Sequence, residues 1–198
     1  MLGLPSFDGT QVLFKGNSAD GMQTGVYRSE LNAALTRVAD QTAVYPLTQV
    51  EFDALMLQGS GKPALSFPLH FNAFRPFEAP VISGQEIVFS GSIEHLEAGL
   101  LSGLFRLTQN NPPERLVTTL FDTTPMNGPV LTNIARPSYD AGVLAFAAKS
   151  GTTFATGAYR FDANGLVELA NSATVMPGQT TTFDDFGFSS FGATAISG

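Results

Sequence analysis

The stretch PVISGQEIVF at residues 80–89 has two close copies in this 198-residue chain, PSFDGTQVLF at residues 5–14 and PSYDAGVLAF at residues 137–146. The start of a fourth copy, TAISG, stands at residues 194–198, so that the opening positions lie 75, 57 and 57 residues apart. Near the end of each copy apolar residues occupy alternate positions, which is the pattern of a half-buried strand. The small residues in the middle indicate a turn or bulge before that strand.

A second motif, glycine followed two positions later by an aromatic residue and then arginine, predicts the next antiparallel strand of each unit. A hairpin then leads into a third apolar stretch, and in the last unit Asn164-Gly165 predicts a tight turn. Residues 29–40 also have apolar residues at helical spacing, but the matching positions of the other units carry Asn-Gly and Pro-Pro, which favours strands. The motifs are GVYR at 25–28, GLFR at 103–106 and GAYR at 157–160, and the third stretches are 35–39, 115–117 and 166–169.

A third motif, two apolar residues placed six and three positions before each later opening, supplies one more predicted strand to each unit. With about four short strands per unit, we predict an all-β fold of antiparallel β-propeller-like blades. Three units are expected, at residues 5–79, 80–136 and 137–193, with the start of a fourth at 194–198, in a single repeat domain 1–198. The apolar pairs are Phe74 and Phe77, Leu131 and Ile134, and Phe188 and Phe191. Phe14, Phe89 and Phe146 are expected to be buried and equivalent.

The first unit is longer than the others, and its surplus lies within residues 47–69. Residues 50–57 of this insertion could form a short helix. Insertions in repeat proteins lie in loops on one face, often the binding face. A packing elaboration is the competing interpretation, and it is the one we favour.

Composition excludes several classes of partner. The formal net charge is −7, and the Lys and Arg residues are scattered singly. Nucleic-acid binding needs a basic surface, so no nucleic-acid partner is expected. The same charge disfavours binding to anionic membranes, and no apolar run approaches the length of a membrane span, so no membrane insertion is expected. The absence of cysteine excludes disulfides and thiolate chemistry.

Taken together, the motifs Pro-Ser-x-Asp/Ser-Gly, x-Val-x-Phe, Gly-x-Tyr-Arg and Phe-x-x-Phe resemble the tandem β-propeller-like repeats of bacterial exported proteins, several of which carry a C-terminal sorting anchor of the PEP type. The closest local matches are LTRVAD at 35–40 and VMPGQTTTF at 175–183. The resemblance covers nearly the whole chain. It implies an extracellular or cell-surface location, with signal and anchor segments not present in this chain. It assigns no catalytic, cofactor-binding or metal-binding residue.

Arg28, Arg106 and Arg160 are the strongest candidates for binding chemistry, because arginines can bind a carboxylate or sulfate. They occupy equivalent positions, however, which favours one local structural contact in each unit. Asp8 and Asp140 are expected to hydrogen-bond the backbone of their own turns. Calcium at Asp20-Gly21 or Asp184-Asp185, and zinc at His70 and His95, are disfavoured by spacing. A glycosidase would need two opposed carboxylates, and the acids available for such a pair are Glu51, Asp53, Glu78, Glu86, Glu94 and Glu97.

These patterns favour a non-catalytic protein over an enzyme: an extracellular structural or recognition module without catalytic residues, cofactors or metals. Self-association is expected because three units leave two unpaired faces. A glycan or matrix is the other expected class of partner. Two chains could complete a six-unit ring, or the chain could be a segment of a longer propeller. A carbohydrate-active hydrolase or lyase with its site in the insertion is one alternative. A filament or sheath subunit that polymerises through open faces is another.

Overall fold

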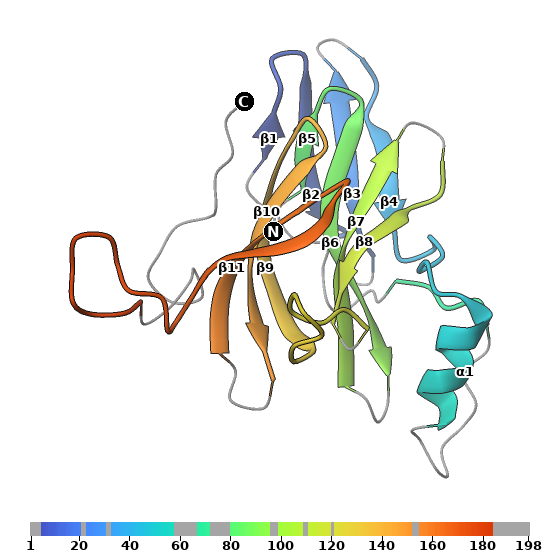
Figure 1. Cartoon of the computed structure of the whole chain (residues 1–198). Coiled ribbons are helices and arrows are strands. Elements are labelled where there is room, and N and C mark those ends of the chain that lie inside the picture. The colour runs from blue at the N-terminus through green and yellow to red at the C-terminus, as the bar shows by residue number, and fades with distance from the viewer. Residues whose placement is uncertain are drawn as a thin grey trace. The chain divides into compact units, whose positions relative to one another are not determined.

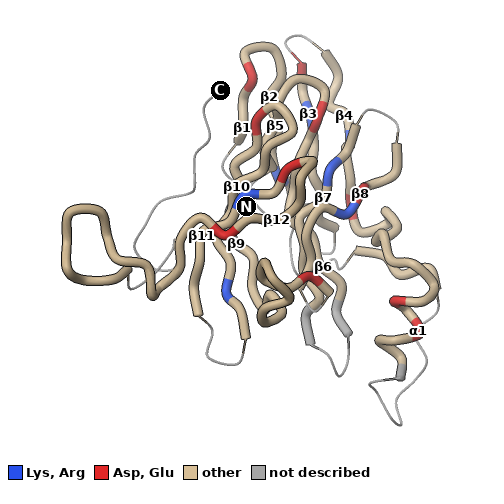
Figure 2. Tube along the Cα trace, viewed as in Figure 1, with Lys and Arg blue, Asp and Glu red and all other residues tan. Residues whose placement is uncertain are grey.

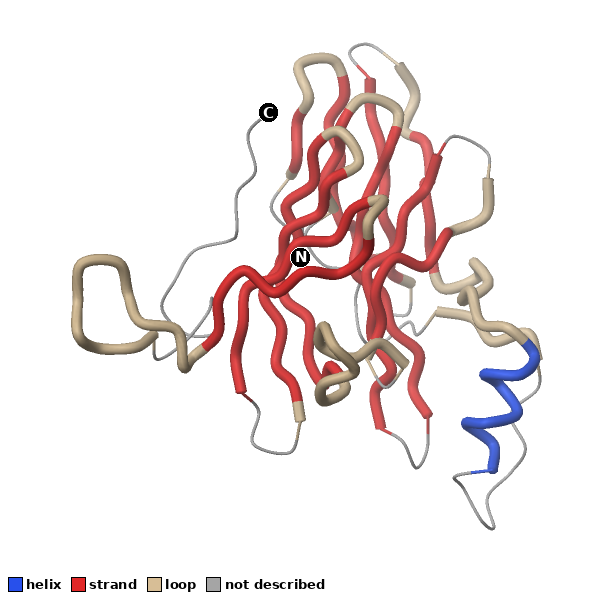
Figure 3. Tube along the Cα trace, in the orientation of Figure 1, coloured by secondary structure: helices blue, strands red, loops and turns tan. Residues whose placement is uncertain are grey.

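The computed structural model describes residues 5–20, 23–30, 33–57, 67–71, 80–95, 99–108, 111–119, 121–151 and 155–183, with the backbone alone at residues 94, 95, 99, 100, 135 and 136. Within these residues the protein consists of strands and a nine-residue helix (Figures 1 and 3). The strands form three four-stranded antiparallel sheets. The all-β prediction is therefore confirmed, whereas a closed propeller is not shown.

Each sheet is built from strands that are consecutive in the chain. The first has the order β1 (Ser6–Phe7), β2 (Gln11–Asn17), β3 (Thr24–Glu30), β4 (Thr36–Asp40). The second has β5 (Val81–Ser83), β6 (Glu86–His95), β7 (Gly99–Thr108), β8 (Glu114–Thr118), and the third has β9 (Leu131–Asp140), β10 (Val143–Ser150), β11 (Ala155–Asp162), β12 (Gly165–Asn171). The chain forms two compact units, Met1–Arg115 and Leu116–Gly198.

The register of the three sheets is the same at corresponding positions. In the second and third strands of each sheet the predicted phenylalanine lies opposite the aromatic residue of the Gly-x-aromatic-Arg motif, and the residue before it lies opposite the arginine. The aromatic pairs are Phe14 with Tyr27, Phe89 with Phe105 and Phe146 with Tyr159, and the arginine pairs are Leu13 with Arg28, Val88 with Arg106 and Ala145 with Arg160. Corresponding residues can therefore be compared directly between sheets.

The apolar pair at the end of the second expected unit, before the third opening, does not form a strand of its own. Leu131 and Ile134 belong to β9, which continues through Pro137 to Asp140 and crosses the expected unit boundary at 136/137. The register shifts between Ala145 and Ala147 of β10: two residues of β9, Arg136 and Pro137, stand opposite the single residue between them. Proline cannot donate to a strand ladder, so a bulge here lets one long strand contain it. Phe74, Phe77, Phe188 and Phe191 lie outside the described residues.

The hairpin predicted at Asn164-Gly165 is present, but its two loop residues are Ala163 and Asn164. Asp162 pairs with Gly165, which has a φ of 101° and begins β12. The Asn164 N–H donates to Asp162 Oδ1 at 2.7 Å. The glycine therefore takes the left-handed conformation after the turn, as it does in hairpins with a following bulge.

The described residues of 29–40 contain no helix, as expected: β3 ends at Glu30 and β4 begins at Thr36. The helix considered within the insertion is α1 (Gln49–Leu57). It begins with a capping box: the Glu51 N–H donates to Thr48 Oγ1 at 3.2 Å, and the Thr48 N–H donates to Glu51 Oε2 at 2.9 Å. Leu55 on its inner side is 1% exposed, whereas Val50 is 77% exposed.

The insertion is held at its base by a short two-stranded neck. The Tyr45 N–H donates to the Leu69 carbonyl at 2.8 Å, and Val44 and His70 form an antiparallel bridge. The rings of Tyr45 and Phe71, which flank this neck, lie 5.0 Å from the ring of Phe105 on the second sheet. Glu51 also forms an ion pair with Arg115 in β8. These contacts within the first unit support the packing role that we favoured for this part of the chain.

The buried tyrosine of the third sheet, Tyr159, should make the folded protein less stable at alkaline pH. Tyr159 is 1% exposed, and its pKa is raised to about 12 by burial, by the charge of Glu168 and by a hydrogen bond to it. An unfolded tyrosine ionises near pH 10, so the stability that Tyr159 contributes is complete below pH 10 and is lost as the pH rises toward 12. Urea unfolding from neutrality upward should show this decline. Tyr159→Phe should flatten it, whereas the matched change Tyr27→Phe should leave it in place. An unchanged decline in Tyr159→Phe would contradict this cause.

Candidate functional site

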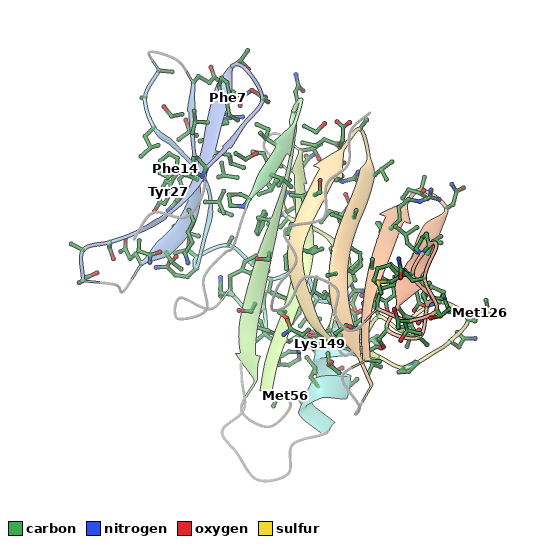
Figure 4. All side chains as sticks on the ribbon, turned by 90° about the vertical axis from the view of Figure 1, so that its left-hand side faces the viewer. Phe7, Phe14, Tyr27, Met56, Met126 and Lys149 are labelled. Atoms are coloured by element: carbon green, nitrogen blue, oxygen red, sulfur yellow. The ribbon has the colours of Figure 1, made fainter. Side chains whose placement is uncertain are left out.

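One side of the first sheet, which we call the outer face, carries Phe7, Val12, Phe14 and Tyr27. Phe7 pairs with Val12 and Phe14 with Tyr27, and Val12 and Phe14 are two positions apart on β2, so all four share one side. Phe7 is 66% exposed and Val12 36% exposed, while the rings of Phe14 and Tyr27 stack at 6.1 Å and are half-buried. Figure 4 labels the three aromatic residues on this sheet.

The corresponding residues of the other two sheets are all buried. None of them is more than 9% exposed: they are Ile82, Ile87, Phe89 and Phe105 in the second sheet, and Tyr139, Leu144, Phe146 and Tyr159 in the third. The prediction that Phe14 is buried like Phe89 and Phe146 is therefore wrong. Its own sheet buries Leu13 and Val26 on the opposite side instead, each 0% exposed. The outer face is therefore an exposed or half-buried apolar surface, whereas the corresponding surfaces of the other two sheets are buried.

The three equivalent arginines differ in their partners. Arg106 forms ion pairs with Glu86 at 3.2 Å and Glu114 at 2.8 Å, which lie on the strands to either side of it. Arg160 pairs with Asp162 at 3.2 Å on its own strand. The predicted local structural contact is thus present for these two. Arg28 forms no hydrogen bond or ion pair with any residue in the described part of the chain.

Arg28 lines a pocket of about 270 Å³ within the first unit. Thr36, Arg37 and Val38 come from the same sheet as Arg28, and Gln85, Ile87, Leu107 and Asn111 come from β6, β7 and the segments beside them. Arg37 is already paired with Asp40 at 2.7 Å. Lys and Arg are few among the strands (Figure 2). Of the three equivalent arginines, Arg28 alone is half-buried without a counter-ion among the residues that the structure describes.

The acids considered for a glycosidase do not form an opposed pair among the side chains that the structure describes. Glu51 caps α1 and pairs with Arg115, Asp53 accepts from Gln49 at 2.8 Å, and Glu86 pairs with Arg106. Burial alone would raise the pKa of Glu51, but the Thr48 N–H and Arg115 hold it below its ordinary value. A carboxylate held ionised in this way suits a structural ion pair and not a general acid. Glu78 and Glu97, and the side chain of Glu94, lie outside the described residues.

Asp8 has the predicted structural role in its turn. Its Oδ1 accepts hydrogen bonds from the Thr10 N–H at 2.9 Å and the Gln11 N–H at 2.8 Å. The bond from the Thr10 N–H is the largest cause of the lowered pKa of Asp8. Asp140 ends β9 beside Ala141, which has a φ of 46°, and its predicted bond to the turn stays a prediction.

Among the residues considered for metals, the structure describes the side chains of Asp20 and His70, and each has a partner within its own loop or neck. His70 Nδ1 lies 2.9 Å from the Thr42 carbonyl, Asp20 accepts from Ser18 at 2.5 Å, and the side chain of His95 and residues 21, 184 and 185 are not described. Across the described ranges, no three His, Cys, Asp or Glu side chains are grouped to hold a metal ion. Nor do these ranges contain a helix long and apolar enough to cross a membrane.

Comparison with known proteins gives no relative: no family model, no curated protein and no solved structure matches this chain. The outer face and the Arg28 pocket are therefore interpreted from their own chemistry. Alignment of the repeats by sequence already distinguishes Arg28 from Arg106. Where Arg106 has Glu86 and Glu114, Arg28 has Gln11 and Thr36, so both carboxylates are replaced by neutral groups.

Proposed function

We propose that this protein is a structural module of propeller-like blades that works outside a bacterial cell and assembles with further copies of itself through the outer face. The observation that carries the proposal is the contrast between sheets: four corresponding positions are buried in the second and third sheets and open to solvent or half-buried in the first. Stacked blades normally cover such faces against neighbouring blades. The extracellular setting rests on the motif resemblance alone.

The chemistry of the outer face supports association. Fully burying an exposed Phe side chain contributes about 1.5–3 kcal/mol. Phe7 still has most of its ring to bury, and Val12, Phe14 and Tyr27 lie beside it. Contiguous exposed apolar patches on soluble proteins commonly mark interaction sites.

A second copy is the occupant that we favour because this chain already contains a sheet-to-sheet arrangement of the required kind. In the first unit the side of the first sheet opposite the outer face buries Leu13 and Val26, and it shares a pocket with Ile87 and Leu107 of the second sheet. Ile87 of the second sheet corresponds to Val12 and lies against the first sheet, whereas Phe7 and Val12 themselves are exposed. A sheet from another copy would cover Phe7 and Val12 in the same manner.

Phe7→Asp tests this proposal. A charge in place of a ring that becomes buried should raise the dissociation constant of self-association at least about tenfold. The measurement is sedimentation velocity over a range of concentrations. Val50→Asp is the matched control, because Val50 is similarly exposed but lies on α1 and not on the outer face.

A wild-type protein that stays monomeric at every concentration would refute self-assembly. Assembly that Val50→Asp weakens as much as Phe7→Asp would refute the assignment to the outer face. Electron microscopy of the assembled protein would then distinguish a closed ring from a filament, since a heterologous contact that does not close produces a fibre.

A further inference from the structure

The Arg28 pocket has the features of an anion-binding site. A half-buried guanidinium loses part of its hydration, and this cost is normally recovered by a partner carboxylate. Arg106 has two such partners in the corresponding place, at 3.2 Å and 2.8 Å, whereas Arg28 has none among the described residues. Its diagonal neighbour Gln11 also has a buried Oε1 that accepts no hydrogen bond from them.

The charge and size of the pocket restrict the ligand. Arg37 is paired with Asp40, so Arg28 supplies the single uncompensated positive charge of the described lining residues. One guanidinium fork makes a bidentate contact with a carboxylate or with a phosphate. Its single positive charge balances the single charge of a carboxylate but leaves one charge of a doubly ionised phosphate without compensation. A volume of about 270 Å³ is at the lower limit of small-molecule sites and fits a single small unit.

The remaining lining residues indicate the chemistry of the part of the ligand beyond the carboxylate. Ile87 and Leu107 are 5% and 9% exposed and provide an apolar wall. Thr36, Gln85 and Asn111 provide a hydroxyl and two amides, which both donate and accept hydrogen bonds. A hydroxylated ring with apolar C–H edges would contact both kinds of surface.

We propose that this pocket binds the carboxylate of a sugar acid, with Arg28 contacting the carboxylate, the amides of Gln85 and Asn111 contacting hydroxyl groups, and Ile87 and Leu107 contacting the ring. The site lies on the opposite side of the first sheet from Phe7. It therefore does not depend on self-assembly, and Phe7→Asp should bind the ligand like the wild type.

Two variants of the site test the proposal by calorimetric titration with galacturonate, with galactose and sodium sulfate as comparison ligands. Arg28→Gln removes the charge. The double variant Gln11→Glu with Thr36→Glu keeps Arg28 but gives it the two carboxylates that surround Arg106. Either change should weaken galacturonate binding about tenfold or more. Arg160→Gln, at the corresponding position of the third sheet, should leave binding unchanged.

The double variant also protects the test from unfolding, since supplying ion-pair partners should not destabilise the protein while it blocks the site. Galacturonate binding that is lost in both site variants and kept in Arg160→Gln supports the proposal. No binding of galacturonate, equal binding of galactose, or tighter binding of sulfate would overturn it, as would galacturonate binding that survives in Arg28→Gln.

Discussion

Phe89→Ala and Phe146→Ala should each lower the free energy of unfolding by about 3–5 kcal/mol, whereas Phe14→Ala should cost clearly less, about 1–2 kcal/mol. Phe89 and Phe146 are 0% exposed and their rings lie 5.9 Å from Phe105 and 5.7 Å from Tyr159. Truncating them leaves a cavity that the surrounding strands cannot fill completely. Phe14 is half-buried, so water can occupy part of the space that its ring vacates.

Urea unfolding at a protein concentration too low for self-association would measure these differences. The three substitutions are chemically identical and are made at corresponding positions, so each serves as a control for the others. If Phe14→Ala proved as costly as Phe89→Ala under these conditions, the outer face would be covered in the monomer, and the proposed assembly would lose its basis.

Phe71→Ala should also lower the free energy of unfolding by about 3–5 kcal/mol, although Phe71 lies outside the three sheets. Its ring is 3% exposed and lies 5.2 Å from Tyr45, 5.9 Å from Phe89 and 5.0 Å from Phe105. Gly91 on β6 lies directly beneath it, since a Cβ there would approach Phe71 Cε1 to 2.6 Å. The removed ring therefore leaves a cavity against the second sheet.

Val50→Ala is the control for Phe71→Ala, because Val50 lies in the insertion whose neck Phe71 flanks but is 77% exposed and should change stability by less than about 0.5 kcal/mol. Thermal or urea unfolding would measure both. A small effect of Phe71→Ala would mean that the neck of the insertion contributes little to the core.

Strand positions could be predicted from this sequence because alternation and turn residues are local. Positions 5–14, 80–89 and 137–146 each contain the predicted turn and the predicted strand after it, whereas the strand before each turn, with which it forms a hairpin, was not predicted. Burial is not local: Phe14 and Phe89 stand in the same sequence pattern, and only the neighbouring surface decides which one is covered. The extent of β9 could not be predicted in this way, because the repeat pattern places a unit opening at Pro137, whereas a bulge carries the strand through this residue.

For the candidate sites, the sequence identified Arg28, Arg106 and Arg160, but it predicted the same structural role for all three. Equal positions in a repeat suggest equal roles, and that inference holds for Arg106 and Arg160, which both pair with acids. It fails at Arg28 because the difference lies in its neighbours. Comparing Gln11 with Glu86, and Thr36 with Glu114, would have singled out Arg28 without any coordinates.

The short neck at Val44 and His70 has a consequence for engineering. Its backbone pairing fixes the two ends of the intervening peptide next to each other, with Tyr45 and Leu69 joined at 2.8 Å. The entropic free-energy cost of closing a flexible loop grows only by about 0.6 kcal/mol for each doubling of the loop length. Foreign peptides grafted between these anchors should therefore be tolerated over a wide range of lengths, which would make this position a suitable one for displaying tags or epitopes.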